Sequence, residues 1–259
     1  MNKVVFNVIC AVVFLMNGYA QESGMYRVIG VTGRIVNQQS GKELQTNEQV
    51  NLQTTLLFGN ASDKAIVLSP SQERYRLELP ASSEQLTVPF DKSLREIKSR
   101  PLLATGTRGL EPVSPASLKK YFGADTFAIV GNTLKIQVKN SEIQKYDLIF
   151  RFEENDQIRE VTSSDFVIRQ SDMGLTQIDE CFILLREGEK VTPVTQVAFF
   201  FLNEKSLHQE FGAWLSAMNI KKSNSAEARR ELRQYCRDVY GLMDNSNLND
   251  VVNRFLSSK

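Results

Sequence analysis

Apolar and polar residues alternate in short runs between residues 25 and 80, and this pattern predicts short β-strands separated by turns. In residues 26–36 the alternation shifts by one position at Gly30, so Gly30 and Gly33 predict a bulge or a tight bend. Residues 65–68 and 75–79 predict two further strands. Short, glycine-containing strands of this kind favour a small barrel or a strongly bent sheet.

The same segment resembles a known family. The runs YRVIGVTGRIV, LQTNEQVNLQTTLLFG and DKAIVLSPSQERYRLEL resemble the FecR-type β domain, in which a V-x-G-x-V strand precedes a series of short strands. They are also similar to the N-terminal part of an exported bacterial family of unknown function, which continues with a segment like YFGADTFAIVGNTLKI. The chain lacks the Gly-Asp pair of the FecR pattern before the third strand, so the resemblance implies no ligand-binding residue.

The next stretch has a different composition. Residues 93–98 (SLREIK) predict a short helix that ends before Pro101. Residues 105–115 are rich in Gly, Pro and Thr, which is typical of a linker or long loop. Ser114 and Pro115 then predict the start of a helix that Gly123 ends.

Strand-like runs return between residues 125 and 202. Leu134, Ile136 and Val138 alternate with polar residues, as in a half-buried strand. Together with later apolar runs they make about six or seven strands, a β-sandwich pattern of roughly immunoglobulin-like size. The Cys…Trp…Cys signature of immunoglobulin domains is missing.

From Asn203 the apolar period becomes helical. Ser206 and Gln209 fit a capping box for a first helix, Ser225 precedes a second, and a third starts at about Asn247. The first helix has an apolar stripe of Leu207, Phe211, Trp214, Leu215 and Met218.

The predicted fold is therefore mainly β with α: a small N-terminal bent-sheet or barrel domain, then a β-sandwich with a C-terminal helical layer. The predicted segments are a signal peptide over residues 1–20, a small β domain over 21–90, a linker with short helices over 91–122, a sandwich over 123–203 and helices over 204–259.

The first twenty residues predict export. Lys3 precedes an apolar run over residues 4–16, and small residues at positions 18 and 20 predict signal-peptide cleavage between Ala20 and Gln21. The run is shorter than the roughly 20 residues of a membrane-spanning helix. An uncleaved anchor and lipid attachment at Cys10 are the weaker alternatives. The expected location is periplasmic or secreted, without stable membrane insertion after cleavage.

Charge excludes one class of function. Cleavage would remove one of 31 basic residues and none of 30 acidic ones, which leaves a formally neutral chain. Nucleic-acid binding needs clustered Lys and Arg, so no nucleic-acid partner is expected. The cleaved chain keeps Cys181 and Cys236, which predict either a disulfide in an oxidising compartment or two buried free thiols.

Candidate catalytic groups are few, because His208 is the single histidine. With Cys181 or Cys236 it would make a thiol–imidazole pair, but its place beside Gln209 and Glu210 predicts a surface position on the first helix. Two acidic clusters suggest paired-acid hydrolysis or a hard cation, although solvated turns are the favoured interpretation. The clusters are Glu153, Glu154 and Asp156, and Asp179 with Glu180.

No catalytic residue, metal or cofactor is therefore predicted. Phe199, Phe200 and Phe201 suggest either a protein-binding patch or a buried strand, and burial is favoured. The leading hypothesis is an exported, non-catalytic accessory or protein-interaction protein of the cell envelope, whose partner is another envelope or exported protein. The alternative is a cell-wall-binding module or an envelope hydrolase with a Cys/His or paired-acid site.

Overall fold

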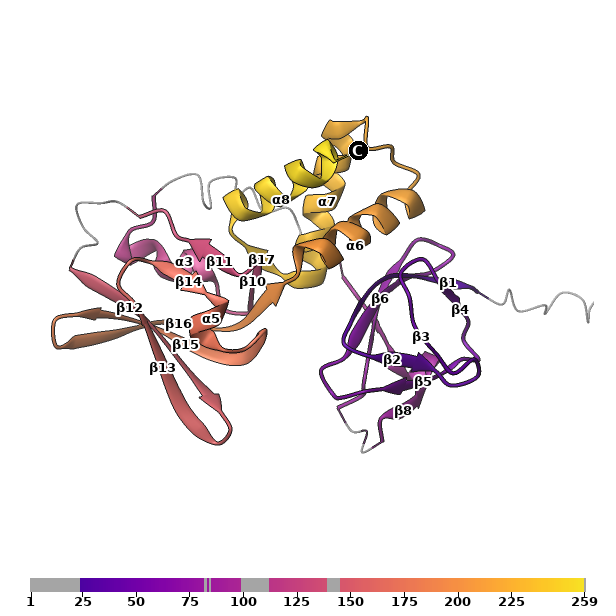
Figure 1. Ribbon diagram of the computed structural model, residues 1–259, viewed down its shortest axis with the longest axis horizontal. Helices are drawn as coiled ribbons and strands as arrows, with labels where there is room; N and C mark the ends of the chain where they lie inside the picture. The colour runs from indigo at the N-terminus through magenta and orange to yellow at the C-terminus, as the bar shows by residue number, and fades with distance from the viewer. Residues whose placement is uncertain (1–23, 82, 84, 99–111, 139–144, 259) are drawn as a thin grey trace, which may run out of the picture. The chain divides into compact units, whose positions relative to one another are not determined.

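The computed structural model describes residues 24–81, 83, 85–98, 112–138 and 145–258 (Figure 1). The chain divides into two compact units, Met1–Glu96 and Ile97–Lys259. The predicted signal peptide, with its cleavage site between Ala20 and Gln21, lies outside the described residues, as does most of the predicted 105–115 loop.

Two antiparallel sheets build the first unit, one in the order β4-β1-β6-β7-β9 and the other in the order β3-β2-β5-β8. Their apolar faces share one core that includes Val28, Leu56, Phe58 and Val67. The elements are β1 (Tyr26–Thr32), β2 (Ile35–Asn37), β3 (Lys42–Glu43), β4 (Gln49–Val50), β5 (Thr55–Phe58), β6 (Lys64–Leu68), β7 (Arg74–Glu78), β8 (Thr87–Pro89), α2 (Phe90–Ser93) and β9 (Leu94–Glu96).

The predicted bend at the first strand is confirmed. The register between β1 and β6 shifts between Val28 and Gly30, which is a β-bulge. Gly33 has φ +80°, and a Cβ added there would lie 1.8 Å from a carboxylate oxygen of Asp63. The unit is a pair of bent sheets, and the described strands form no closed barrel.

The predicted helix over residues 93–98 is wrong. Helix α2 ends at Ser93, and the next three residues form β9, in which Leu94 pairs with Leu77 of β7. A six-residue helix is too short to be stable alone, whereas the edge of β7 offers backbone partners. Residues 91–96 therefore pack within the first unit.

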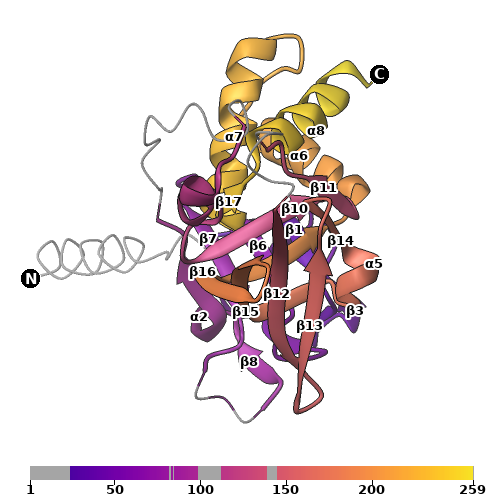
Figure 2. The ribbon, with the colours of Figure 1, turned by 90° about the vertical axis from the view of Figure 1, so that its left-hand side faces the viewer.

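A mixed six-stranded sheet forms the centre of the second unit, in the order β13-β12-β15-β16-β10-β17. β10 runs parallel to both β16 and β17, and the other neighbours are antiparallel. The strands are β10 (Thr126–Val130), β12 (Tyr146–Glu154), β13 (Gln157–Ser163), β15 (Gln177–Glu187), β16 (Lys190–Leu202) and β17 (Leu242–Met243). Figure 2 shows the long β12–β13 hairpin and the C-terminal helices at opposite ends of this unit.

One face of this sheet shares its core with a second, smaller layer. That layer contains a two-stranded sheet, β11 (Thr133–Lys135) with β14 (Val167–Arg169), and the short helices α3 (Leu118–Phe122) and α5 (Gln170–Met173). A 3₁₀ turn, η2 (Pro115–Ser117), leads into α3, and Gly123 ends it as predicted. Phe199 and Phe201 are buried in β16 and Phe200 is half-buried, so the predicted core strand is confirmed for the face that carries Phe199 and Phe201.

The C-terminal helical region is confirmed and consists of α6 (Glu204–Ala217), α7 (Ser225–Tyr240) and α8 (Asn245–Ser257). Its predicted caps need correction. The side chain of Asn203, and not of Ser206, caps α6 by accepting a hydrogen bond from the Ser206 N–H. Asn203 follows the last residue of β16 with an extended backbone, which is the conformation of an N-cap. Asn224, and not Ser225, holds the N-cap position of α7, and Asp244 caps α8.

None of the helices in the described part of the chain has both the length and the apolar composition that a membrane span requires.

The mainly β fold with α elements is thus confirmed.

Candidate functional site

Strands β12 and β15 part at one end of the six-stranded sheet. They pair from Tyr146 with Glu187 as far as Phe152 with Cys181, and no further. Beyond that point β12 continues in its hairpin with β13, and the first residues of β15 pair with β16. A bulge between Ile178 and Cys181 accompanies the separation, since bulges bend the strand that contains them. The result is a fork between the end of β12 and the start of β15.

A groove of about 420 Å³ occupies this fork. Buried Phe152 and Ile178 line its inner side, and half-buried Leu175 adds a third apolar surface. At its rim, 43% of Phe182 and 76% of Ile158 are exposed to solvent. The groove therefore combines an apolar lining with two large apolar side chains that the described fold leaves uncovered.

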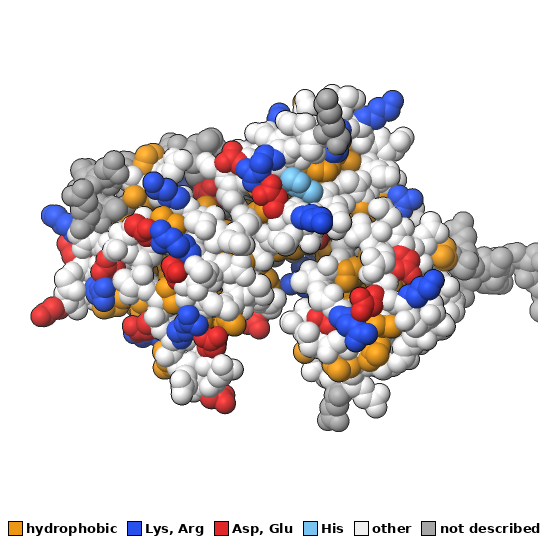
Figure 3. Space-filling view, viewed as in Figure 1, with side chains coloured by type: hydrophobic (Ala, Val, Ile, Leu, Met, Phe, Trp, Pro, Cys, Tyr) orange, Lys and Arg blue, Asp and Glu red, His pale blue; other side chains and the backbone are white. Residues whose placement is uncertain are grey.

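The groove also unites the two acidic clusters that the sequence keeps apart. Glu153 lines it from β12, and Asp179 and Glu180 line it from the bulge of β15. Figure 3 shows acidic and apolar side chains next to each other over the β12–β13 part of the second unit. The remaining acids of the first cluster have other surroundings: Glu154 bonds to Arg159, and Asp156 lies in the hairpin turn with φ 60°.

Among the residues that the structure describes, Arg151 is the one cationic side chain that lines the groove. Its guanidinium is already paired with Glu160 on β13 at 2.6 Å. Three carboxylates thus face one neutralised guanidinium, and the groove has a net negative charge. Sequence reasoning found these acids but assigned them to solvated turns.

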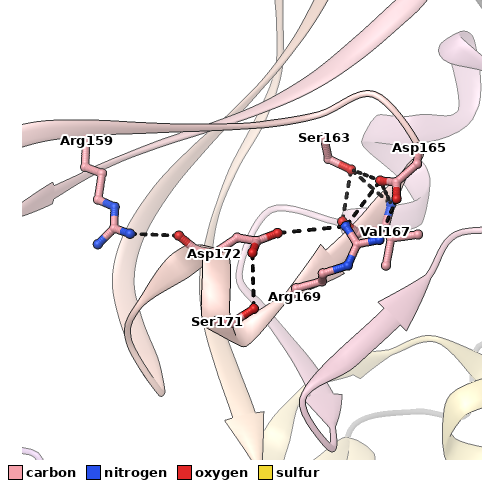
Figure 4. Close-up of polar contacts among 7 residues, drawn as sticks. All are labelled: Arg159, Ser163, Asp165, Val167, Arg169, Ser171 and Asp172. Atoms are coloured by element: carbon pink, nitrogen blue, oxygen red, sulfur yellow. Dashed lines mark hydrogen bonds and ion pairs between the residues drawn. The ribbon is translucent and has the colours of Figure 1, made fainter.

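A second polar cluster lies between β13, β14 and α5 (Figure 4). It differs from the groove because its charged side chains are paired with one another. Arg159 donates to the carbonyl of Asp172 at 2.8 Å, and Arg169 bonds to Asp165 at 2.5 Å. The Arg169 guanidinium, aided by a backbone N–H and the Ser163 hydroxyl, lowers the pKa of Asp165 to about 2. These charges bind each other and hold α5 against the sheet, so they form a structural cluster.

His208 lies partly buried at the contact between α6 and α8, which corrects the predicted surface position. Its ring packs 5.4 Å from Phe255 and 6.2 Å from Phe211, measured between centroids. Its Nε2 lies 3.3 Å from the carbonyl oxygen of Val251. The helical stripe placed the ring outside the α6 core, but α8 covers that flank of α6.

The structure does not bring the cysteines to His208. Cys181 lies in the core of the six-stranded sheet, and Cys236 lies on the buried face of α7. Both are free, buried thiols, which is one of the two states that the sequence left open. Burial raises the pKa of Cys181 to about 12, and burial together with the charge of Glu210 raises that of Cys236 well above its ordinary value. Since the thiolate is the nucleophile, these surroundings favour packing over reactivity.

Sequence reasoning placed Glu210 of α6 on a polar flank beside His208, but the structure buries it, and it is only 5% exposed. Its carboxylate accepts hydrogen bonds from Tyr235 at 2.8 Å and Tyr240 at 2.5 Å, both in α7. Burial raises its pKa to about 7, while the two tyrosine hydrogen bonds oppose the shift. Its spacing was a signal: Glu210 is three residues after Leu207 and four before Trp214, on the apolar stripe.

No group of three or more His, Cys, Asp or Glu side chains is placed to hold a metal ion in the part of the chain that the structure describes. Comparison with protein-family models, with curated proteins and with solved structures gave no significant match. Function is therefore inferred from the groove and its side chains.

Proposed function

We propose that this chain is an exported, non-catalytic accessory protein of the cell envelope, and that it binds another exported or envelope protein through the groove between β12 and β15. The observation that supports the proposal is Phe182, a large aromatic side chain exposed at the rim of an apolar, acid-lined groove. Exposed aromatic residues beside a pocket are typical binding hot spots. Full burial of a phenylalanine contributes about 1.5–3 kcal/mol, so covering the 43% of Phe182 that is exposed contributes about 1 kcal/mol.

The geometry favours binding over the alternative of an envelope hydrolase. A carboxylic acid that donates a proton in catalysis is usually kept protonated by an apolar, desolvated environment. Glu153, Asp179 and Glu180 are instead all exposed to water. His208 packs at the contact between α6 and α8, the two thiols are buried, and none of the three side chains lines the groove.

For the first unit, the proposal remains a FecR-type β domain. The series of short strands from β1 to β7, with a bulge at Gly30, supports it. We assign no ligand to this unit.

Site-specific photo-crosslinking in the producing cells tests the proposed function. A photoreactive phenylalanine analogue replaces Phe182 or Ile158 at the groove, or Val191 as the control. Val191 is 45% exposed and pairs with Arg186, at the opposite end of β15 from the groove. We expect the two groove positions to yield an adduct with the same partner protein, in the envelope or the medium, on a chain that starts at Gln21.

The adduct should disappear when Asp179→Lys is combined with the crosslinker, because the altered groove no longer matches its partner. Equal adducts from position 191, or no adduct from either groove position, would show that the groove is not a binding site. A chain that keeps Met1 would contradict the proposed export.

A further inference from the structure

We propose, on the basis of the proposed function, that the groove selects an extended segment of the partner in which a Lys or Arg stands beside an apolar side chain. Three features of the fork support this proposal: its open strand edges, its charge and its size.

The open edges favour an extended backbone. Past the pair of Phe152 with Cys181, the last residues of β12 have a strand neighbour only in β13. Gln177 and Ile178 at the start of β15 likewise pair only with β16. Both strands therefore turn an unpaired edge toward the groove within the described sheet. A segment in β conformation can bond to such edges and place alternate side chains into the pockets beside them.

The negative charge of the groove favours basic side chains in the bound segment. Glu153, Asp179 and Glu180 line the groove, and the Arg151 guanidinium beside them is occupied by Glu160. Among the described residues, no side-chain hydrogen bond or ion pair reaches the Glu153 carboxylate. The carboxylates of Asp179 and Glu180 accept hydrogen bonds from the neutral side-chain amides of Gln177 and Gln196, which leave their charges in place. An acidic segment would add like charges to this site, whereas a Lys or Arg would complement it. Phe152, Ile178 and the rim residue Phe182 provide the surface for the apolar neighbour.

The size of the groove limits its occupant. A volume of about 420 Å³ is typical of a site that admits a few side chains. The occupant is thus a short segment rather than the face of a folded domain.

Fluorescence anisotropy with two synthetic peptides tests this inference on the purified chain. One labelled peptide alternates Lys with Phe and Val, and the second has Glu in place of every Lys. We expect the lysine peptide to bind at least about tenfold more tightly than the glutamate peptide, and its affinity to fall as salt is added. Phe182→Asp should lower the affinity for the lysine peptide by about tenfold or more.

A matched pair of double variants separates the groove from overall charge. The first variant combines Glu153→Lys with Asp179→Lys and reverses the charge of the groove. The second combines Glu187→Lys with Glu189→Lys and makes the same change of net charge at the other end of β15. The groove variant should reverse the preference toward the glutamate peptide, and the control variant should keep it.

Equal effects of the two double variants, or a preference of the native chain for the glutamate peptide, would overturn the inference. If either of these peptide results is found while position 182 still crosslinks to a partner, the groove remains a binding site. Only the proposal of a cationic, extended partner segment is then rejected. Failure of the crosslinking itself would reject the proposed function.

Discussion

Phe199→Ala is expected to lower the free energy of unfolding of the second unit by about 3–5 kcal/mol, the range found when a buried phenylalanine is truncated. Phe199 lies in β16, a central strand of the six-stranded sheet, and is fully buried. Its ring centroid is 5.7 Å from that of Phe150, 5.8 Å from that of Phe127 and 6.1 Å from that of Phe122. The substitution removes contacts between three strands and α3 at once and leaves a cavity among them.

Urea denaturation followed by circular dichroism measures this effect. Phe182→Ala is the matched control, because it removes the same ring from the neighbouring strand β15, where 43% of the side chain is exposed. The control should change the free energy of unfolding by less than about 1 kcal/mol. Similar losses for the two variants would mean that Phe182 belongs to the core and would weaken its assignment to binding.

Glu210 is expected to make the second unit less stable as the pH rises from about 4.5 to about 7. Burial raises the pKa of this carboxyl from 4.5 to about 7, so the folded state binds its proton more tightly than the unfolded state. Below the lower value both states hold the proton and stability is highest. Between the two values the unfolded state alone releases it, so stability falls by roughly 3 kcal/mol across this window and stays low above it.

Glu210→Gln should abolish this dependence, because the amide oxygen still accepts hydrogen bonds from Tyr235 and Tyr240 but carries no charge. Tyr235→Phe should make the loss at high pH larger, since it removes a hydrogen bond that stabilises the carboxylate. Glu189→Gln, at an exposed site, is the control and should leave the profile unchanged. Urea denaturation at several pH values provides the measurement. A native profile that stays flat from pH 4.5 to 7, or rises with pH, would contradict the assignment.

The local elements of this fold were predictable because they depend on near neighbours in the chain. The alternation at Leu134 and the stripe that contains Phe211 marked a strand and a helix, and Gly30 marked the bulge. Pairing between distant segments was not predictable. β10 joins β16 and β17 in parallel, and β9 forms on the edge of β7, through contacts that no local pattern specifies.

At the candidate site, too, the individual residues were predictable but their proximity was not. The acids at positions 153 and 179 were visible in the sequence, but their proximity depends on the β12–β15 register and on the bulge in β15. Phe182 lies in the apolar run of residues 181–185, where the sequence alone does not distinguish an exposed side chain from its buried neighbours. Strand geometry sends Cys181 and Phe182 to opposite faces of the sheet, and in the structure the first is buried and the second exposed.

Amide hydrogen exchange of the chain, alone and in complex with the partner captured at position 182, tests the central claim most directly. If the groove is the binding site, exchange should slow at residues 152–154 and 177–182, where the two strands part, and should stay unchanged in α6, α7 and α8. Slower exchange confined to those helices or to the first unit, with none at the fork, would contradict the account.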